Sequence, residues 1–379
     1  KEGKTPGYSG RCRSLTAAEI EEFEQQGRKP ATRFRMPGTD FTWNDLVRGE
    51  LSFAKEHVPD YVIVRATGEP LYTLVNPVDD ALMHITHVLR GEDLLSSTPR
   101  QIAMHNALAD IGVGSGRLPH FGHLPYVMGE GNRKLSKRDP ESALLMYREE
   151  GYLPEGLLNY LALLGWSMGD DQEFFSLSQM AERFDIKRVS GNPARFDLRK
   201  CTAINGDWIR SLDADDLSER LVPYLIADNL LPEVPNTEQR HLVRLATPLV
   251  QERMETLRQG AAMLGFLFFA DAGIEDPLTS GTRAFEIETS ERSQITADAK
   301  TILGFALDAL SNVDDWNHVA IEAILREVLL ERHGLKPKNA FGPIRLATAG
   351  RKVSPPLFES LQLLGKARTL HRIESALHL

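Results

Sequence analysis

The residues best suited to chemistry lie in a short basic segment. Residues 133–138 read RKLSKR, with four positive charges in six positions, although the net charge of the chain is −9. Ammonium groups and a hydroxyl can stabilise the negative charge that develops on phosphate oxygens. Lys134, Ser136 and Lys137 therefore predict a loop that binds the phosphates of a nucleotide as pyrophosphate leaves. The alternative is a solvated loop tip, because short charged strings also arise by chance.

A second polar group is suited to binding a carboxylate. Arg90 ends a predicted strand, and its planar guanidinium offers two parallel donors. Tyr72 and Asn76, four residues apart on the preceding predicted strand and turn, offer neutral polar contacts. Glu92 and Asp93 could orient a ribose or an amino group. A carboxylate substrate together with a nucleotide suggests activation of an acid by adenylation. The alternative is a local ion-pair cluster of Arg90 with the two acids.

An α/β segment is predicted over residues 71–132 and would position both groups. Strands are expected at LYTLV (71–75), HITHVLRG (84–91) and HLPYVM (123–128), with Asp79 and Asp80 capping a short helix. SSTPRQIAMHNAL (96–108) is predicted to be a helix with Pro99 in its first turn. The order strand, helix, strand favours a parallel sheet, whose ligands gather beyond the carboxyl ends of the strands.

The basic segment is expected to be a loop with fixed ends. The strand at 123–128 precedes it. After it, Asp139 suits a helix N-cap, Pro140 suits the first helical position, and Gly151 ends the helix. A second helix, LPEGLLNYLALLGW (153–166), is apolar on several faces and is expected to be buried.

The two flanking regions differ in character. Residues 1–70 are rich in turns and alternate apolar with polar residues, which is typical of β structure. One helix at 16–26 is predicted there, because Thr16 and Glu19 have the spacing of a capping box. From about 205 to 379, apolar residues recur at three- and four-residue spacing, which predicts one or two helical bundles. The predicted fold class is α/β plus all-α, in two to four domains.

Composition favours a cytoplasmic protein. No run reaches the roughly 18 uninterrupted apolar residues of a membrane span, and the first residues lack the apolar core of a secretory signal. The two cysteines, Cys12 and Cys201, fit a reducing compartment. An acidic chain with local basic stripes suits selective binding of a shaped polyanion, and scattered surface charge is the alternative.

Long blocks of the sequence closely resemble bacterial glutamyl-tRNA synthetases, which are class I enzymes. The matching blocks are PLYTLVNPVDDALMHITHVLRGEDLLSSTPRQIAMHNAL, FGHLPYVMGEGNRKLSKRDP, GYLPEGLLNYLALLGWS and PARFDLRK. The resemblance runs from GYSGRCRSL near the start to PPLFESLQLLGK near the end, so it covers nearly the whole chain.

The resemblance implies how ATP is bound. KLSKR matches the KMSKS signature of the family, which makes Lys134, Ser136 and Lys137 the loop that binds the ATP phosphates. Asp93 matches an acid that contacts ATP, and Val127 lies in backbone that borders the adenine. ATP and Mg²⁺ are the implied cofactors.

The resemblance also implies the substrate and the activity. Tyr72, Asn76 and Arg90 match positions that hold glutamate, with Arg90 on its side-chain carboxylate. The implied enzyme is a glutamate–tRNA ligase, which activates L-glutamate to glutamyl-adenylate and transfers it to the 3′ end of tRNA(Glu). We expect L-glutamate and tRNA(Glu) as partners, no membrane contact and a monomer.

The implied fold joins part of a Rossmann-type catalytic domain to helical anticodon-binding domains. Residues 1–70 would be the remainder of an insertion that binds the tRNA acceptor end, and residues 71–133 the second half of the catalytic domain. Residues 134–205 would hold the KLSKR loop and a stem-contact domain. Residues 206–379 would form the anticodon-binding region.

The sequence departs from the family pattern in two places. The HIGH signature is missing: HFGH (120–123) imitates it but lies too close to the basic loop and is flanked by prolines that suit a strand. We therefore expect an N-terminally incomplete enzyme that binds tRNA without charging it. Cys12 has Ser14 where zinc-binding relatives have histidine, so no metal site is expected.

Two other functions remain open. A non-catalytic tRNA-binding protein is compatible with the missing signature. A glutaminyl-tRNA synthetase would share the catalytic core but would use β-barrels for the anticodon, which the helical pattern after residue 205 disfavours.

Overall fold

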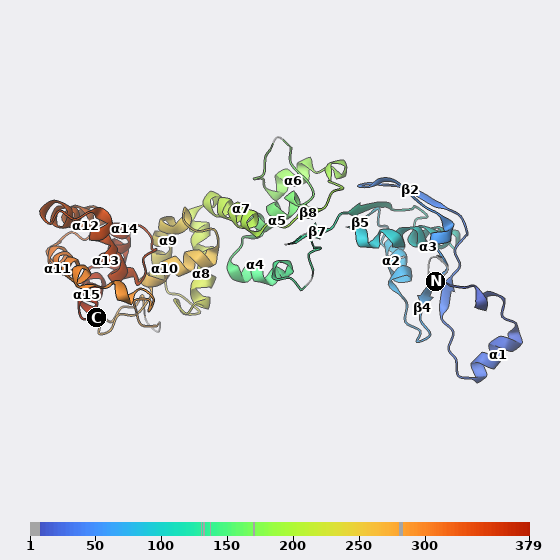
Figure 1. Ribbon diagram of the computed structural model, residues 1–379, viewed down its shortest axis with the longest axis horizontal. Coiled ribbons are helices and arrows are strands. Elements are labelled where there is room, and N and C mark those ends of the chain that lie inside the picture. Colours follow the sequence, from blue (N-terminus) through green and yellow to red (C-terminus); the bar gives the residue numbers. More distant parts are fainter. Residues whose placement is uncertain (1–7, 130, 132, 137, 170, 280–282) are drawn as a thin grey trace. The chain divides into compact units, whose positions relative to one another are not determined.

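The computed structural model describes residues 8–129, 131, 133–136, 138–169, 171–279 and 283–379. The chain forms two compact units. Unit 1 comprises Lys1–Ser136 and Leu161–Phe196, and unit 2 comprises Lys137–Tyr160 and Asp197–Leu379. Figure 1 shows strands together with helices in unit 1 and helices in unit 2, which confirms the predicted fold class of α/β plus all-α.

The strands described in unit 1 associate in pairs. Two pairs are antiparallel: β1 (Thr32–Phe34) with β4 (Tyr61–Val64), and β2 (Phe41–Asp45) with β3 (Gly49–Phe53). Two pairs are parallel: β5 (His87–Gly91) with β6 (His120–Leu124), and β7 (Val127–Met128) with β8 (Ala194–Arg195).

The helices described in unit 1 are α1 (Ala17–Gln25), α2 (Tyr72–Leu82), α3 (Thr98–Asp110) and α6 (Leu177–Arg183). The predictions at residues 16–26 and 96–108 match α1 and α3 closely. Thr16 and Glu19 form the expected capping box at the start of α1. Helix α3 carries Pro99 in its first turn and connects the parallel strands β5 and β6, so the predicted strand–helix–strand order is confirmed.

The strand predicted at residues 71–75 is wrong, because α2 begins at Tyr72. Leu74, Val78 and Ala81 pack against the core of unit 1, which also contains side chains of β2 and α3. Their spacing of three and four residues is helical, but a window of five residues could not distinguish it from a strand. Asp79 and Asp80 consequently lie inside α2 and do not cap it.

The elements around the basic segment also differ from the prediction. The strand expected at 123–128 is divided, because Pro125 separates β6 from β7 and proline lacks the N–H that a ladder needs. The helix expected from Asp139 begins as a 3₁₀ turn at Pro140–Ser142, and α4 (Leu144–Glu150) starts only after Ala143, whose backbone is extended. Gly151 ends α4 with a φ of 83°, as expected. Helix α5 (Pro154–Leu163) is less buried than predicted, since Leu158 and Leu161 are exposed.

The helical character predicted after about residue 205 is confirmed. The helices there are α8 (Ala214–Ala227), α9 (Thr237–Gln251), α10 (Leu257–Leu264), α11 (Ala297–Ser311), α12 (His318–Leu325), α13 (Pro337–Ala349), α14 (Leu357–Leu364) and α15 (Lys366–Leu377), and α7 (Leu198–Ser211), which begins before that residue, precedes them. Short 3₁₀ turns elsewhere span Arg11–Ser14, Lys55–His57, Glu92–Ser97, Ile186–Arg188, Gly265–Leu267 and Arg292–Gln294, and a π-helix spans Arg326–Arg332.

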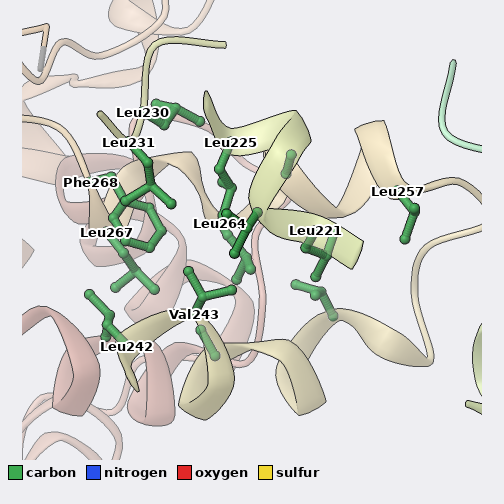
Figure 2. Close-up of a cluster of buried hydrophobic side chains, with 14 of the residues drawn as sticks. Leu221, Leu225, Leu230, Leu231, Leu242, Val243, Leu257, Leu264, Leu267 and Phe268 are labelled. Atoms are coloured by element: carbon green, nitrogen blue, oxygen red, sulfur yellow. The ribbon is translucent and has the colours of Figure 1, made fainter. Parts of the chain in front are cut away.

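Unit 2 contains two hydrophobic core clusters. In the first, Leu221 and Leu225 of α8 face Val243 of α9 and Leu264 of α10, and all four side chains are fully buried (Figure 2). The second cluster joins α11, α12, α13 and α15; its fully buried members include Leu303, Leu310, Ile321, Ile344 and Ile373. Burying each such side chain stabilises the fold by roughly 1.5–3 kcal/mol relative to exposure.

A buried ion cluster also stabilises unit 2. The Asp271 carboxylate accepts hydrogen bonds from Nε of Arg368 at 2.7 Å and Nε of Arg372 at 2.6 Å. The two guanidinium groups also donate to the main-chain oxygens of Phe266, Leu267, Phe269 and Thr348. None of the helices in the described part of the chain is both long and apolar enough to cross a membrane.

Candidate functional site

Arg90 stands where the parallel strands of unit 1 end. It is the last but one residue of β5, and its register partner in β6 is His123. Strand β5 is followed directly by the 3₁₀ turn Glu92–Ser97 and then by α3. The crossover therefore brings Arg90 beside the first turn of α3 at the carboxyl edge of the sheet, where ligands of α/β proteins gather.

The Arg90 guanidinium is held by several hydrogen bonds. Its Nη1 donates to the Tyr72 hydroxyl at 3.2 Å, its Nη2 to the Thr98 hydroxyl at 2.8 Å, and its Nε to Nε2 of His123 at 3.2 Å. The structure thus brings together two of the residues expected to bind glutamate, Arg90 and Tyr72. Tyr72 is exposed, so the hydroxyl end of this contact faces solvent.

Asn76 is connected to the same region through α3. Its side-chain oxygen accepts a hydrogen bond at 2.9 Å from the amide of Gln101, which is fully buried. Tyr72 and Asn76 are one turn apart on α2, so both side chains lie on one face of that helix. The sequence predicted these two residues on a strand and turn, whereas the structure places both on helix α2.

The acids beside Arg90 pair with other cations. Glu92 forms an ion pair with Arg48 and accepts a hydrogen bond from the backbone N–H of Tyr126 at 3.1 Å. Asp93 lies 3.7 Å from the ammonium nitrogen of Lys134. Among the described residues, Glu92 therefore pairs with Arg48 and Asp93 with Lys134. The alternative, a local ion-pair cluster of Arg90 with the two acids, is not observed there.

The described part of the basic segment folds back on β7. The backbone N–H of Leu135 donates to the carbonyl of Val127 at 2.9 Å, and the N–H of Gly129 donates to the carbonyl of Arg133 at 2.8 Å. Ser136 follows directly and is half-buried. Lys137, the third residue expected to bind phosphate, lies outside the described residues.

The ammonium group of Lys134 lies close to Asp93 and to the ring of Tyr126. Its ammonium nitrogen is 3.8 Å from the centre of the Tyr126 ring, and half of its side-chain surface is exposed. The ring face and the carboxylate both attract a cation. They hold an exposed ammonium group close to an acid that was expected to contact ATP.

Sequence reasoning missed a buried pair behind Arg90. Asp45 ends β2 and accepts hydrogen bonds from Nδ1 of His123 at 2.6 Å and from its backbone N–H at 3.0 Å. Both side chains are fully buried. One signal was available: β2 alternates buried and exposed residues, and Asp45 falls on the same face as Phe41 and Trp43, so an acid at a core position needed a partner.

The surroundings set the charges of this pair. Burial alone would raise the pKa of Asp45, but hydrogen bonds from the His123 ring and from the backbone N–H groups of residues 123, 47 and 48 hold it below its usual range. Burial lowers the pKa of His123 despite the opposing effect of Asp45, and the charges of Arg90 and Arg48 lower it further. At neutral pH, Asp45 is ionised and His123 is neutral.

HFGH (120–123) forms strand β6, and it does not stand at the start of a helix. This agrees with the expectation that its flanking prolines suit a strand. Among the described residues, no cluster of three or more His, Cys, Asp and Glu side chains could hold a metal ion.

Two family models match the chain. The model described as the catalytic domain of tRNA synthetases class I (E and Q) matches residues 1–203, and an anticodon binding domain matches residues 216–377. Glutamate–tRNA ligase of Nocardioides sp. is 52% identical over 374 residues, which are 99% of this chain and 74% of that protein. The chain belongs to the glutamate–tRNA ligase family.

Further relatives support the assignment of the chain to this family. The glutamate–tRNA ligase of Paenarthrobacter aurescens is 51% identical over 375 residues, which are 98% of this chain and 72% of that protein. A crystal structure of a glutamate–tRNA ligase from Elizabethkingia meningosepticum, in complex with its amino acid, superposes with a TM-score of 0.76. It is 26% identical and covers 99% of this chain and 74% of its own. The resemblance and the class I synthetase fold expected from the sequence are thereby confirmed, as is the class of enzyme, an aminoacyl-tRNA ligase.

Proposed function

We propose that this protein activates L-glutamate with ATP, which forms glutamyl-adenylate and releases pyrophosphate, and then transfers the glutamyl group to the 3′ end of tRNA(Glu). The observation that carries the proposal is the guanidinium of Arg90, held at the carboxyl edge of the parallel strands within a chain that is 52% identical to a glutamate–tRNA ligase. The reaction would take place in the cytoplasm, where tRNA is charged.

Glutamate would bind between β5 and α2. A guanidinium that is fixed in orientation can receive a carboxylate through two parallel N–H donors, and this geometry favours a charged acid over a neutral amide. Arg90 would bind the side-chain carboxylate of glutamate. Tyr72 and Asn76, on the adjoining face of α2, would contact the α-amino and α-carboxylate groups. The short link between Arg90 and Tyr72 supports a common site for the three residues.

ATP would bind at the second group of residues, on the basic loop and beside it. Lys134, Ser136 and Lys137 would contact its phosphates, Asp93 would contact the nucleotide, and backbone near Val127 would border the adenine. The exposed ammonium of Lys134 and the half-buried Ser136 are suited to phosphate oxygens. Mg²⁺ would neutralise phosphate charge, and the Asp93 carboxylate offers the oxygen ligand that this ion prefers. Most of the catalysis would come from positioning and charge neutralisation.

The remaining regions would bind tRNA. We assign residues 1–70 to the acceptor end and residues 71–133 to the catalytic domain. Residues 134–205 would contact the stem beside the KLSKR loop. Residues 206–379 would bind the anticodon, which is supported by the anticodon binding domain matched over 216–377.

Charging of tRNA(Glu) tests the proposal. With ATP present, L-glutamate should be attached to tRNA(Glu) and AMP released, whereas L-glutamine at the same concentration should be used roughly a hundredfold less efficiently, because its amide leaves the Arg90 charge unpaired. Aminoacylation with labelled amino acids measures both rates. Equal use of glutamine, or a release of AMP that does not depend on the amino acid, would contradict the proposal.

A further inference from the structure

His123 lies directly behind Arg90 and is completely enclosed. It faces Arg90 across the β5–β6 register, its side chain has no exposed surface, and its ring nitrogens reach Asp45 on one side and Thr98 and Arg90 on the other. Arg48 donates a hydrogen bond to the main-chain oxygen of His123 at 3.2 Å. Asp45, Arg90 and Arg48 are thus the charged groups that face it.

The donors and acceptors determine the tautomer of His123. An ionised carboxylate only accepts hydrogen bonds, so Nδ1 of His123 must carry the proton that is shared with Asp45 at 2.6 Å. Nε of Arg90 only donates, so Nε2 of His123 must offer a lone pair at 3.2 Å. A neutral imidazole with its proton on Nδ1 satisfies both contacts.

These contacts occupy one edge of the Arg90 guanidinium. The edge formed by Nε and Nη2 meets His123 and Thr98, which are fully buried. At the end formed by Nη1 and Nη2, the partners are the hydroxyl of the exposed Tyr72 and the main-chain oxygen of Leu94 at 3.5 Å. A carboxylate can approach a guanidinium on either edge. Because the partners on the first edge are fully buried and Tyr72 on the second is exposed, the substrate carboxylate is directed to the second edge.

We propose that His123, with its tautomer set by Asp45, is a positioning residue that fixes the plane of Arg90 and thereby selects which edge receives the side-chain carboxylate of glutamate. This inference rests on the proposed role of Arg90. The pair would act as an oriented acceptor: Asp45 keeps the Nε2 lone pair facing Arg90, and protonation of Nε2 would place an N–H against the Nε–H of Arg90.

Two substitutions separate this role from a structural one. In His123→Asn, the amide nitrogen can replace Nδ1 and still donate to Asp45, but the acceptor for Arg90 is lost. In His123→Gln, the amide oxygen can replace Nε2 and accept from Arg90, but the donor to Asp45 is lost. Positioning predicts that glutamate affinity follows the acceptor: His123→Asn should bind L-glutamate roughly tenfold more weakly, and His123→Gln should stay within about threefold of wild type.

Thermal unfolding of the same variants distinguishes a positioning role of His123 from a purely structural one. His123→Gln leaves a buried carboxylate without one donor, so its unfolding midpoint should be lower than that of His123→Asn. Stability and affinity should therefore rank the two variants in opposite orders. His105→Asn is the matched control, because His105 is a buried histidine of α3 outside this network. It should lower stability and leave glutamate affinity unchanged.

Calorimetric titration with L-glutamate measures these affinities, and Arg90→Ala is included to test the site itself. If Arg90→Ala binds glutamate as well as wild type, the substrate site in the proposed function is wrong. If Arg90→Ala weakens binding but His123→Asn does not, or if affinity simply follows stability, the positioning role alone is wrong.

The dependence of glutamate affinity on pH provides a second readout. Burial lowers the pKa of His123, so the neutral form persists below the ordinary histidine pKa of about 6.5. Wild-type affinity should therefore stay level from about pH 8 to 6.5 and fall at lower pH, as His123 becomes protonated. His123→Gln should lack this fall above the pKa of the glutamate side chain, and an identical decline in both proteins would overturn the inference.

Discussion

Arg90→Ala is expected to weaken binding of L-glutamate by about a hundredfold, because it removes the charge-assisted partner of the substrate carboxylate. Binding of ATP should stay unchanged, since the described residues that we assign to ATP lie on the basic loop, at Asp93 and at Val127. Arg90→Lys should be intermediate, because an ammonium group keeps the charge but lacks the planar fork. Calorimetric titrations with L-glutamate and ATP measure both effects.

A matched control removes a different guanidinium from unit 1. Arg100 of α3 lies over the Tyr61 ring at 5.7 Å and makes no contact with Arg90 in the structure as described. Arg100→Ala should therefore keep the glutamate affinity of wild type. A loss of ATP affinity in Arg90→Ala, or an equal loss of glutamate affinity in Arg90→Ala and Arg100→Ala, would show that the substitutions disrupt the whole site. Either result would contradict a specific role for Arg90.

Asp271→Asn is expected to destabilise unit 2 by about 3–5 kcal/mol, because it leaves the buried Arg372 without its counter-charge and leaves Arg368 with only Asp276, at 3.5 Å. The side chains of Arg368, Arg372 and Asp271 are at most 5% exposed. Burial lowers the pKa of Arg372 to about 10, yet the group stays charged at neutral pH. Urea unfolding followed by helical circular dichroism measures the loss.

An exposed ion pair of the same unit is the control for this prediction. Glu322 and Arg326 are four residues apart, and the side chain of Arg326 is 49% exposed. Glu322→Gln should cost less than about 0.5 kcal/mol, as surface pairs of this spacing do. Similar losses in Asp271→Asn and Glu322→Gln would show that the buried cluster contributes no more than a surface pair.

The features that sequence analysis predicted well depend on short-range chemistry. Thr16 and Glu19 are three residues apart, and Pro99 and Gly151 act on the backbone beside them, so their effects are visible in a few letters. Arg90 was found because it ends a strand whose apolar pattern is local. The resemblance to glutamyl-tRNA synthetases then supplied roles for residues that pattern alone left ambiguous.

The features that sequence analysis missed depend on contacts that are distant in the chain. Asp45 and His123 are 78 residues apart, and only the pairing of β5 with β6 and the packing of β2 bring them together. Tyr72 and Asn76 were predicted on a strand and turn, because a short apolar window fits either period. The letters of HFGH resemble a catalytic signature and carry no sign that His123 accepts a hydrogen bond from Arg90.

Paired titrations with ATP and AMP test most directly whether Lys134 and its loop bind the phosphates that leave as pyrophosphate. Lys187→Ala, which removes an exposed lysine of the same unit, serves as the control. We predict that Lys134→Ala loses roughly tenfold in affinity for ATP and keeps its affinity for AMP, since one charge-assisted contact to the terminal phosphates is removed. Unchanged ATP affinity in Lys134→Ala, or an equal loss of affinity for ATP and AMP, would contradict a role of Lys134 in binding these phosphates.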